Sequence, residues 1–204
     1  DRRYSGASSY VSVLTVTNMS GQAIESELPP QFNPEITDQN IWSETISDIG
    51  GRTIATIDTY GRINRFYYDA LGRQIYQVSN LQGQSISNPI PPAYSSTYPD
   101  QNIVIRTVYD GDGRVIASVD TLGTISRSYY DEIGRAVSVV QNLTGQDIYL
   151  SSPPTYNSLY PDQNIIFTTV YDLNGQTIAT IDTLGRISRS YYDGLGRNTA
   201  IAQN

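Results

Sequence analysis

The amino-acid sequence predicts an all-β fold, a repetitive antiparallel β-meander of hairpins that forms a curved wall or a segment of a tube or filament. Three observations predict it. The chain repeats itself every 62 residues, its apolar runs are short and rich in Val, Ile, Thr and Tyr, and Asp/Asn-x-x-Gly turns separate these runs. Such runs are typical of strands, and none shows the 3.6-residue period of a helix.

The repeat is clearest in a seven-residue motif, Tyr-Tyr-Asp-x-x-Gly-Arg, which occurs three times at the same spacing. Its fixed positions are Tyr67, Tyr68, Asp69, Gly72 and Arg73, then Tyr129, Tyr130, Asp131, Gly134 and Arg135, then Tyr191, Tyr192, Asp193, Gly196 and Arg197. Because the whole chain follows the 62-residue spacing, the sequence predicts one continuous array. It comprises a diverged partial unit (1–37), two full repeats (38–99 and 100–161) and a partial third (162–204). Repeated units that contact their neighbours build an extended surface.

The second repeat illustrates the predicted order of elements. Strands are expected at Ile103–Tyr109, Arg114–Val119, Ile125–Tyr130 and Ala136–Gln141, and turns at Asp110–Gly113, Asp120–Gly123, Asp131–Gly134 and Asn142–Gly145. An Asp or Asn side chain accepts a hydrogen bond from the backbone two residues later, and Gly adopts the positive φ that closes a type I turn with a bulge. A repeat is therefore expected to hold about five strands, followed by a long Pro-rich loop at Ser151–Asn164.

The two faces of the predicted strands are less clearly separated. In the strand at Arg186–Tyr192, one face takes Ile187, Arg189 and Tyr191, and the other takes Ser188, Ser190 and Tyr192. Two half-polar faces suit a thin wall better than an ordinary sandwich. A β-solenoid, in which a coil of about 21 residues holds two strands and two corners, remains the alternative fold.

Composition excludes several classes of function. The chain has no Cys and no His, and all thirteen of its basic residues are Arg. We therefore expect no enzyme, no catalytic residue, no cofactor and no metal site; the Asp110–Gly113 segment is read as a plain turn rather than a calcium loop. The net charge of −7 argues against nucleic acid as a partner. No apolar run is long enough for membrane insertion, and the polar, Tyr-rich composition favours an extracellular or cell-surface location.

A second recurring segment is the Pro-Pro-x-Tyr…Tyr-Pro-Asp-Gln-Asn loop, which places four tyrosines at fixed spacing, namely Tyr94, Tyr98, Tyr156 and Tyr160. Aromatic rings in such a row are candidates for stacking on glycans or for docking a neighbouring chain. The alternative is structural, with Pro and Tyr folding the loop over the sheet to cover polar backbone. The sequence leaves both interpretations open.

The Tyr-Tyr-Asp-x-x-Gly-Arg motif resembles the YD repeat of the Rhs family, shared by bacterial Rhs proteins, insecticidal toxin-complex shells and animal teneurins. Weaker copies at Tyr109–Arg114 and Tyr171–Gly175 extend the resemblance over most of the chain from Asp38 onward. It implies a spiralling β-sheet that closes into a hollow shell, with the motif residues as structural parts of each hairpin. Family shells use many more repeats, and neither a self-cleavage motif nor a toxin domain is recognisable here.

These observations lead to three functional hypotheses. The first is a structural extracellular protein that builds a β-walled tube, filament or shell, with copies of itself or adjacent repeats of the same chain as partners. The second is a cell-surface adhesin stalk whose Tyr/Pro loops bind glycans. The third is a part of a larger Rhs-type shell that encapsulates a toxin.

Overall fold

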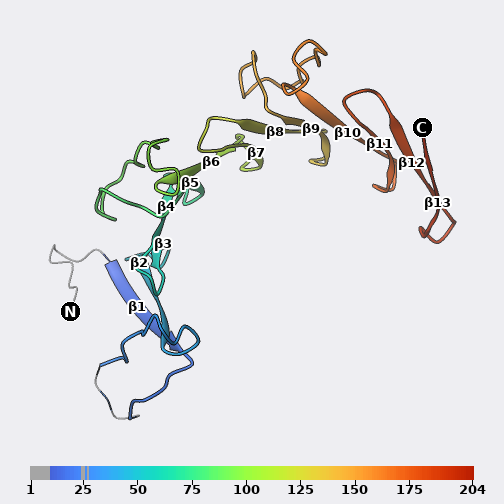
Figure 1. The fold of residues 1–204 in the computed structure, drawn as a ribbon. Helices are drawn as coiled ribbons and strands as arrows, with labels where there is room; N and C mark the ends of the chain where they lie inside the picture. Colours follow the sequence, from blue (N-terminus) through green and yellow to red (C-terminus); the bar gives the residue numbers. More distant parts are fainter. Residues whose placement is uncertain (1–9, 24–25, 27) are drawn as a thin grey trace. The chain divides into compact units, whose positions relative to one another are not determined.

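The computed structural model describes residues 10–23, 26 and 28–204. Thirteen strands occupy these residues, and their order in the sheet is the order of the chain (Figure 1). None of the described residues forms a helix of the length and apolarity needed to cross a membrane. The chain divides into two compact units, Asp1–Ile105 and Arg106–Asn204, hereafter the N-terminal half and the C-terminal half.

Within each half, neighbouring strands pair antiparallel. The N-terminal half contains β1 (Tyr10–Thr17), β2 (Ile41–Asp48), β3 (Thr53–Ile57), β4 (Ile63–Tyr68) and β5 (Gln74–Ser79). The half boundary falls inside β6 (Ile103–Tyr109), which is followed by β7 (Val115–Val119), β8 (Ile125–Tyr130), β9 (Ala136–Gln141), β10 (Ile165–Tyr171), β11 (Thr177–Ile181), β12 (Ile187–Tyr192) and β13 (Asn198–Gln203). The predicted antiparallel meander is confirmed. The β-solenoid alternative is wrong, because consecutive strands pair side by side instead of stacking as coils.

A full repeat holds four strands, so the expectation of about five is wrong. In the second repeat β6 to β9 match the predicted strands to within a residue, but Asn142–Gly145 does not close a hairpin. It opens a long loop, residues 142–164, that connects β9 to its antiparallel neighbour β10. Residues 80–102 and 18–40 lie between the corresponding strands of the preceding repeats. We call these three connections the long loops.

Each long loop is closed at its base by a pair of asparagines in the left-handed region. Asn142 and Asn164 both have φ of 50°, and the Asn164 N–H donates to the Asn142 carbonyl at 2.9 Å. The Asn142 side chain donates to the carbonyl of Asp162, while the Thr144 N–H donates to Oδ1 of Asn164. Asn tolerates positive φ better than other residues with a side chain. The Asn pair therefore holds the two ends of the loop at the spacing of neighbouring strands.

In each half, one face of the sheet is covered by the first part of a long loop, residues 80–102 or 142–164. In the N-terminal half the buried core comprises Ile46, Ile54, Ala55, Ile57, Tyr67, Val78, Leu81 and Ile86. Leu81 and Ile86 belong to the loop of residues 80–102, and Leu143 of the next loop is buried with Tyr129 and Val140 in the C-terminal half. The sequence predicted a thin wall with two half-polar faces. This expectation is correct for one face only, because the loop forms a second layer over the other.

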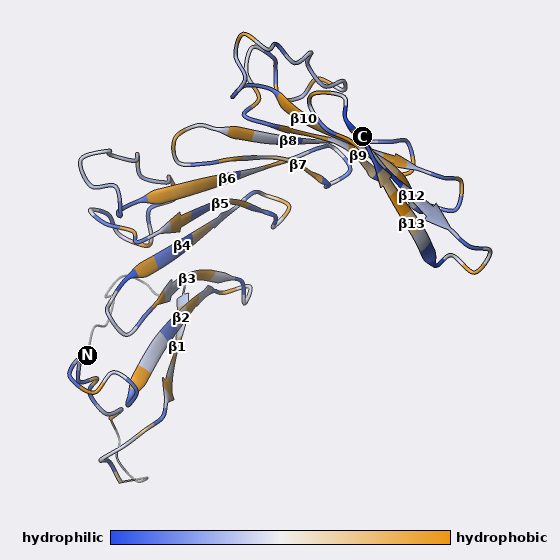
Figure 2. Ribbon diagram, turned by 45° about the vertical axis from the view of Figure 1, so that its right-hand side comes forward, coloured by the Kyte–Doolittle hydropathy of each residue, from blue (hydrophilic) through white to orange (hydrophobic). Residues whose placement is uncertain are grey.

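The opposite face is rich in hydroxyl and amide side chains. The cross-strand register aligns Thr45, Thr56 and Asn64 in the N-terminal half, and Thr107, Ser118 and Ser126 in the C-terminal half. Apolar and polar residues are accordingly interspersed along the strands of each half (Figure 2). Residues aligned across neighbouring strands share a face, so these rows are polar on the side away from the covering loop.

Candidate functional site

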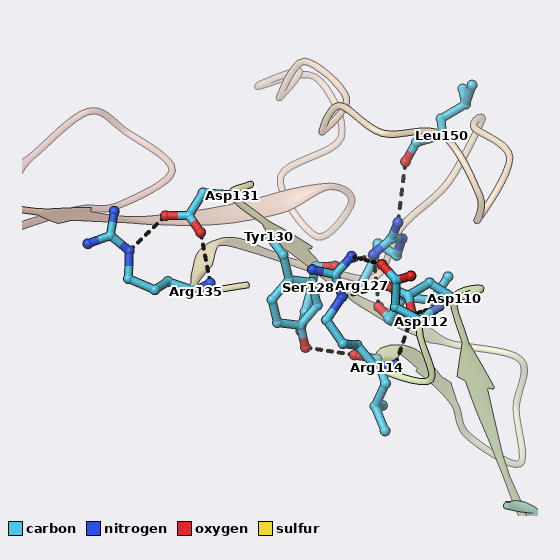
Figure 3. Close-up of polar contacts among 11 residues, drawn as sticks. Asp110, Asp112, Arg114, Arg127, Ser128, Tyr130, Asp131, Arg135 and Leu150 are labelled. Atoms are coloured by element: carbon cyan, nitrogen blue, oxygen red, sulfur yellow. Dashed lines mark hydrogen bonds and ion pairs between the residues drawn. The ribbon is translucent and has the colours of Figure 1, made fainter. Parts of the chain in front are cut away.

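The Asp of each motif organises the turn that follows it. In the second repeat Oδ1 of Asp131 accepts hydrogen bonds from the backbone N–H groups of Ile133 and Arg135, at 3.1 and 2.8 Å. Its Oδ2 accepts from Nε of Arg135 at 2.7 Å (Figure 3). The same three contacts occur at Asp69 and Asp193. The carboxylate thus accepts three hydrogen bonds from its own hairpin and fixes the shape of the turn.

The turn closes on a glycine in the left-handed region. Gly134 has φ of 85°, and its N–H donates to the Asp131 carbonyl at 3.0 Å. The register of β8 and β9 shifts by a bulge between Tyr129 and Tyr130, just before this turn. Gly72 and Gly196 have φ of 80° and 77°. A Cβ at such a position costs roughly 1–2 kcal/mol for most residues.

Gly134→Val is therefore expected to lower the free energy of unfolding by about 2 kcal/mol. The loss should be larger than for Gly196→Val, because strands on both sides depend on the Gly134 hairpin whereas Gly196 precedes the edge strand β13. Chemical denaturation of the two variants measures the order. Asp112→Ala is the control, since Asp112 is exposed and its ion pair with Arg114 is a surface one. Equal losses at the two glycines would contradict coupling between neighbouring hairpins.

The turn carboxylates also predict how stability depends on pH. Hydrogen bonds and arginines hold the pKa below its ordinary value at seven described positions, namely Asp48, Asp58, Asp69, Asp110, Asp131, Asp182 and Asp193. At Asp193 the largest cause of the lowered pKa is the Arg197 backbone N–H, followed by the Arg197 guanidinium. A carboxyl group with a lowered folded-state pKa contributes stability above its unfolded pKa of about 4, and this stability is lost as the pH falls through the folded pKa.

The melting temperature is accordingly expected to stay constant between pH 7 and 5 and to fall below about pH 4. Thermal melts followed by circular dichroism across this range measure it. The chain has no His, so no side chain with an ordinary pKa titrates between pH 5 and 7. A fall in melting temperature within that window would contradict the assignment of stability to the turn carboxylates.

The second Tyr of each motif ties the hairpin to the strand before it. The Tyr130 hydroxyl donates to the carbonyl of Val115 at 2.7 Å, and the Arg114 guanidinium lies 5.3 Å from the Tyr130 ring centroid (Figure 3). Tyr68 and Tyr192 donate to the equivalent carbonyls at the same distance. The hydroxyls of these tyrosines therefore bind the backbone of the preceding strand and link neighbouring strands of the sheet.

The first Tyr of the motif belongs to a buried cluster centred on an arginine. Arg127, on β8, is only 5% exposed, and its guanidinium lies 4.5 Å from the centroid of the Tyr129 ring. Nε donates to the carbonyl of Ile148 at 2.7 Å, and Nη1 donates to that of Ile116 at 3.2 Å. Nη2 donates to the carbonyl of Leu150 at 3.4 Å (Figure 3). Ile148 and Leu150 lie in the long loop. Arg127 therefore hydrogen-bonds the loop to the sheet beneath it.

The N-terminal half contains the same cluster. Arg65 donates through Nε to the carbonyl of Ile86 at 2.7 Å and through Nη1 to that of Ile54 at 2.8 Å, and it lies 4.5 Å from the Tyr67 ring centroid. Burial lowers the pKa of the Arg65 guanidinium, yet an arginine remains charged in proteins. A buried charge whose donors meet carbonyls is tolerated because its hydrogen bonds replace those to water.

A glutamine of the long loop completes each cluster. Gln84 donates to the Tyr67 hydroxyl, and Gln146 donates to the Tyr129 hydroxyl, both at 3.1 Å. Burial raises the pKa of the Tyr67 and Tyr129 hydroxyls, so both rings stay neutral at physiological pH. We call the set of one Arg, one Tyr and one loop Gln the loop lock.

The third copy of the Tyr-Tyr-Asp motif has the Arg and Tyr of the loop lock, but no described loop lies over them. Arg189 and Tyr191 have the same spacing as Arg127 and Tyr129, but both are exposed, Tyr191 by 45%. The guanidinium still lies 5.4 Å from the centroid of the Tyr191 ring. Within the described part of the chain, no loop carbonyl accepts a hydrogen bond from Arg189. This open face lies on β12 in the C-terminal half.

The four loop tyrosines singled out from the sequence differ in exposure. Tyr94 and Tyr156 are half-buried, whereas Tyr98 and Tyr160 are exposed. All four lie in the later part of their loops, while the buried covering residues lie in the earlier part. The structure places Tyr160 beside a cavity of about 580 Å³, further lined by Gln146, Pro153, Asn157, Gln163 and Asn164.

The loop lock is the part of the structure that the sequence argument missed. A signal was present, because Arg65, Arg127 and Arg189 recur in phase two residues before the motif, and Gln84 and Gln146 recur four residues after the loop Asn. As for metals, the described residues contain no group of three or more His, Cys, Asp or Glu side chains arranged to hold an ion.

Comparisons with known proteins relate the chain to others by fold. The crystal structure of TcdB2-TccC3 matches with a TM-score of 0.54 and 19% sequence identity, over 80% of this chain and 8% of that chain. TcdB2-TccC3-Cdc42 and TcdB2-TccC3-TEV match over the same shares at 18% identity, with TM-scores of 0.54 and 0.52. No family model matches the sequence, and no curated protein matches it. The chain is thus similar in fold to a small part of TcdB2-TccC3.

Proposed function

We propose that this chain is a structural segment of an extracellular β-walled assembly, a tube, filament or shell, and that it performs no catalysis. The observation that carries the proposal is the use of the motif side chains. In both full repeats the Asp and Arg build the turn, the second Tyr ties neighbouring hairpins, and the first Tyr contributes to the loop lock. A unit whose motif side chains all serve its own scaffold is suited to extending a wall.

The fold similarity to TcdB2-TccC3 supports a place in a larger assembly, since this chain spans less than a tenth of the matched chain. A related reading is that the segment belongs to a larger shell of the Rhs type. The full-length gene separates the two readings, because a shell of this kind would carry many further repeats together with a toxin domain.

Assembly of the purified 204-residue protein tests the proposal. Analytical ultracentrifugation over a wide concentration range, with electron micrographs of the same samples, is expected to show end-to-end particles of uniform width. The proposal predicts that the width stays constant while the length grows. Only compact monomers at every concentration would count against a tube or filament and leave the larger shell to be examined in the longer chain.

A second candidate function, glycan binding by an adhesin stalk, is favoured by the cavity beside Tyr160. An exposed aromatic ring next to the amide of Gln163 has the stacking surface and a hydrogen-bonding group that a sugar ring requires. A glycan array tests it, with Tyr160→Ala as the loss-of-binding variant and Tyr149→Ala, an exposed Tyr that does not line this cavity, as the control. No bound glycan, or binding unchanged by Tyr160→Ala, would remove this candidate.

A further inference from the structure

The second repeat holds a cavity of about 300 Å³ between the sheet and its covering loop. Its lining includes four tyrosines and two arginines, namely Tyr109, Tyr129, Tyr130, Tyr149, Arg114 and Arg127. These residues come from β6, β8, the position before β7 and the long loop of residues 142–164. All of them lie in the C-terminal half, and none lines the cavity beside Tyr160. The cavity is therefore a separate candidate site within one compact unit.

The aromatic lining of this cavity is richer than the repeated scaffold requires. In the first repeat the phases of Tyr109 and Tyr149 are occupied by Ser47 and Ser87, yet the same turn, loop lock and covering loop form there. The other two tyrosines and both arginines of the lining have identical residue types in the first repeat. Tyr109 and Tyr149 therefore add aromatic walls to the cavity that the fold of a repeat does not need.

The cavity is also lined by a buried positive charge. Among the described residues, no carboxylate forms an ion pair with Arg127. The acidic residue of the lining, Asp110, pairs instead with Arg114, whose Nε lies 2.7 Å from Oδ2 (Figure 3). Burial lowers the pKa of the Arg127 guanidinium, but an arginine stays charged in proteins. Two guanidinium groups and one carboxylate leave the lining with a net positive charge, which an anionic ligand would balance.

Arg127 retains hydrogen-bonding capacity for such a ligand. A guanidinium has five N–H donors. The structure gives Arg127 four contacts, all with backbone carbonyls: Nε donates to Ile148, Nη1 to Ile116 and Ser128, and Nη2 to Leu150. The Nη2 contact is long, at 3.4 Å, and this nitrogen carries two hydrogens. Nη2 is therefore the atom at which the carboxylate of a ligand would accept a charge-assisted hydrogen bond.

We propose that this cavity binds a small aromatic carboxylate. The carboxylate accepts a hydrogen bond from Nη2 of Arg127, and the ring packs against Tyr109 and Tyr149, since aromatic rings favour stacked and edge-to-face contacts with one another. An aliphatic or inorganic anion balances the charge but leaves the aromatic lining uncovered. Tyr149 is 61% exposed and becomes partly covered on binding. The site adds ligand binding to the proposed structural function and does not depend on assembly, because its lining lies within one repeat.

Calorimetric titration of the 204-residue protein with para-hydroxybenzoate tests the proposal. Saturable binding at one site per chain is expected, with affinity lower by roughly tenfold or more for para-hydroxybenzamide, which has no charge, and for acetate, which has no ring. Tyr149→Ser, which gives this position the residue type of Ser87, is expected to lower the affinity roughly tenfold. Tyr160→Ser is the matched control, since Tyr160 is an exposed Tyr of the same loop that does not line this cavity, and its affinity should be unchanged. Circular dichroism confirms that both variants are folded.

Nitrogen–proton spectra of protein with isotope-labelled arginine locate the bound ligand. The Nε–H signal of Arg127 is expected to shift on titration. That of Arg65, which makes the same lock contacts in the first repeat without the two added tyrosines, should stay in place. Equal shifts at the two arginines, shifts confined to exposed arginines, or an affinity unchanged by Tyr149→Ser overturn the proposal. Binding of acetate or of the benzamide as tight as that of the benzoate overturns it as well. No binding of para-hydroxybenzoate at millimolar concentration also overturns it, and leaves the proposed structural function standing.

Discussion

Arg127→Ala is expected to lower the free energy of unfolding by about 3 kcal/mol. The substitution removes a buried guanidinium whose donors meet the carbonyls of Ile116, Ile148 and Leu150, and it leaves those acceptors without their partner. Each buried acceptor that loses its hydrogen bond costs roughly 1–3 kcal/mol, reduced where water can reach it. Guanidinium denaturation followed by circular dichroism measures the loss. Limited proteolysis of residues 142–164 should accelerate in the same variant.

Arg189→Ala is the matched control for this measurement. Arg189 has the same sequence surroundings and the same place beside a Tyr ring, but it is exposed and no loop lies over it. Its replacement is expected to change the free energy of unfolding by less than about 0.5 kcal/mol in dilute protein, as for ordinary surface positions. Equal losses at Arg127 and Arg189 would mean that the arginine acts through its own hairpin and that the loop contact contributes nothing.

Leu143→Ala is expected to cost about 2–3 kcal/mol. Leu143 lies at the start of the long loop, is 4% exposed, and packs with Tyr129 and Val140 against the sheet. Truncating a buried Leu removes its transfer free energy and leaves a cavity, for a typical loss of 2–5 kcal/mol. A value at the low end is expected because the loop can partly collapse into the space. Denaturant unfolding again provides the measurement.

Met19→Ala is the comparison for Leu143→Ala, since both residues follow the first Asn of a long loop and Met19 is 52% exposed. In monomeric protein its replacement is expected to be nearly neutral. If Leu143→Ala proved as harmless as Met19→Ala, the loop would not be an energetic part of the fold, and the covered face would have to be held by the strands alone.

Much of the fold was predictable because strand and turn chemistry is local. The strands at Ile103–Tyr109 and Ile125–Tyr130 were placed to the residue, since Asp opens each turn and a Gly with positive φ closes it. The number of strands per repeat was predicted wrongly because Asn142–Gly145 shares its spacing with the hairpin turns. Its Asn partner, Asn164, is 22 residues away, and local patterns do not report such a contact.

The candidate site was predictable only in part for the same reason. The arrangement of Asp131 and Arg135 is contained in five residues, whereas the partners of Arg127 are backbone carbonyls 21 and 23 residues later. Every residue has a backbone carbonyl, so no pattern of residue types predicts which carbonyl accepts the hydrogen bond. An Arg in a strand also reads as a polar, outward residue, although here its charge is buried and solvated by the loop.

The paired asparagines at the base of each long loop fix its two ends, so that the part of the loop between them can be replaced. The hydrogen bonds of Asn142 with Asn164 and Asp162 fix the two ends, and the lock holds the segment up to Leu150 on the sheet. The stretch beyond, from Pro153 to Pro161, lies beside Gln146 and Asn164 at the cavity that these two residues line, but makes no hydrogen bond to either of them. Because the entropy of closing a loop grows slowly with its length, this apex can be lengthened or replaced at little cost to the sheet. A wall built this way can therefore display unrelated peptides at a spacing of one repeat.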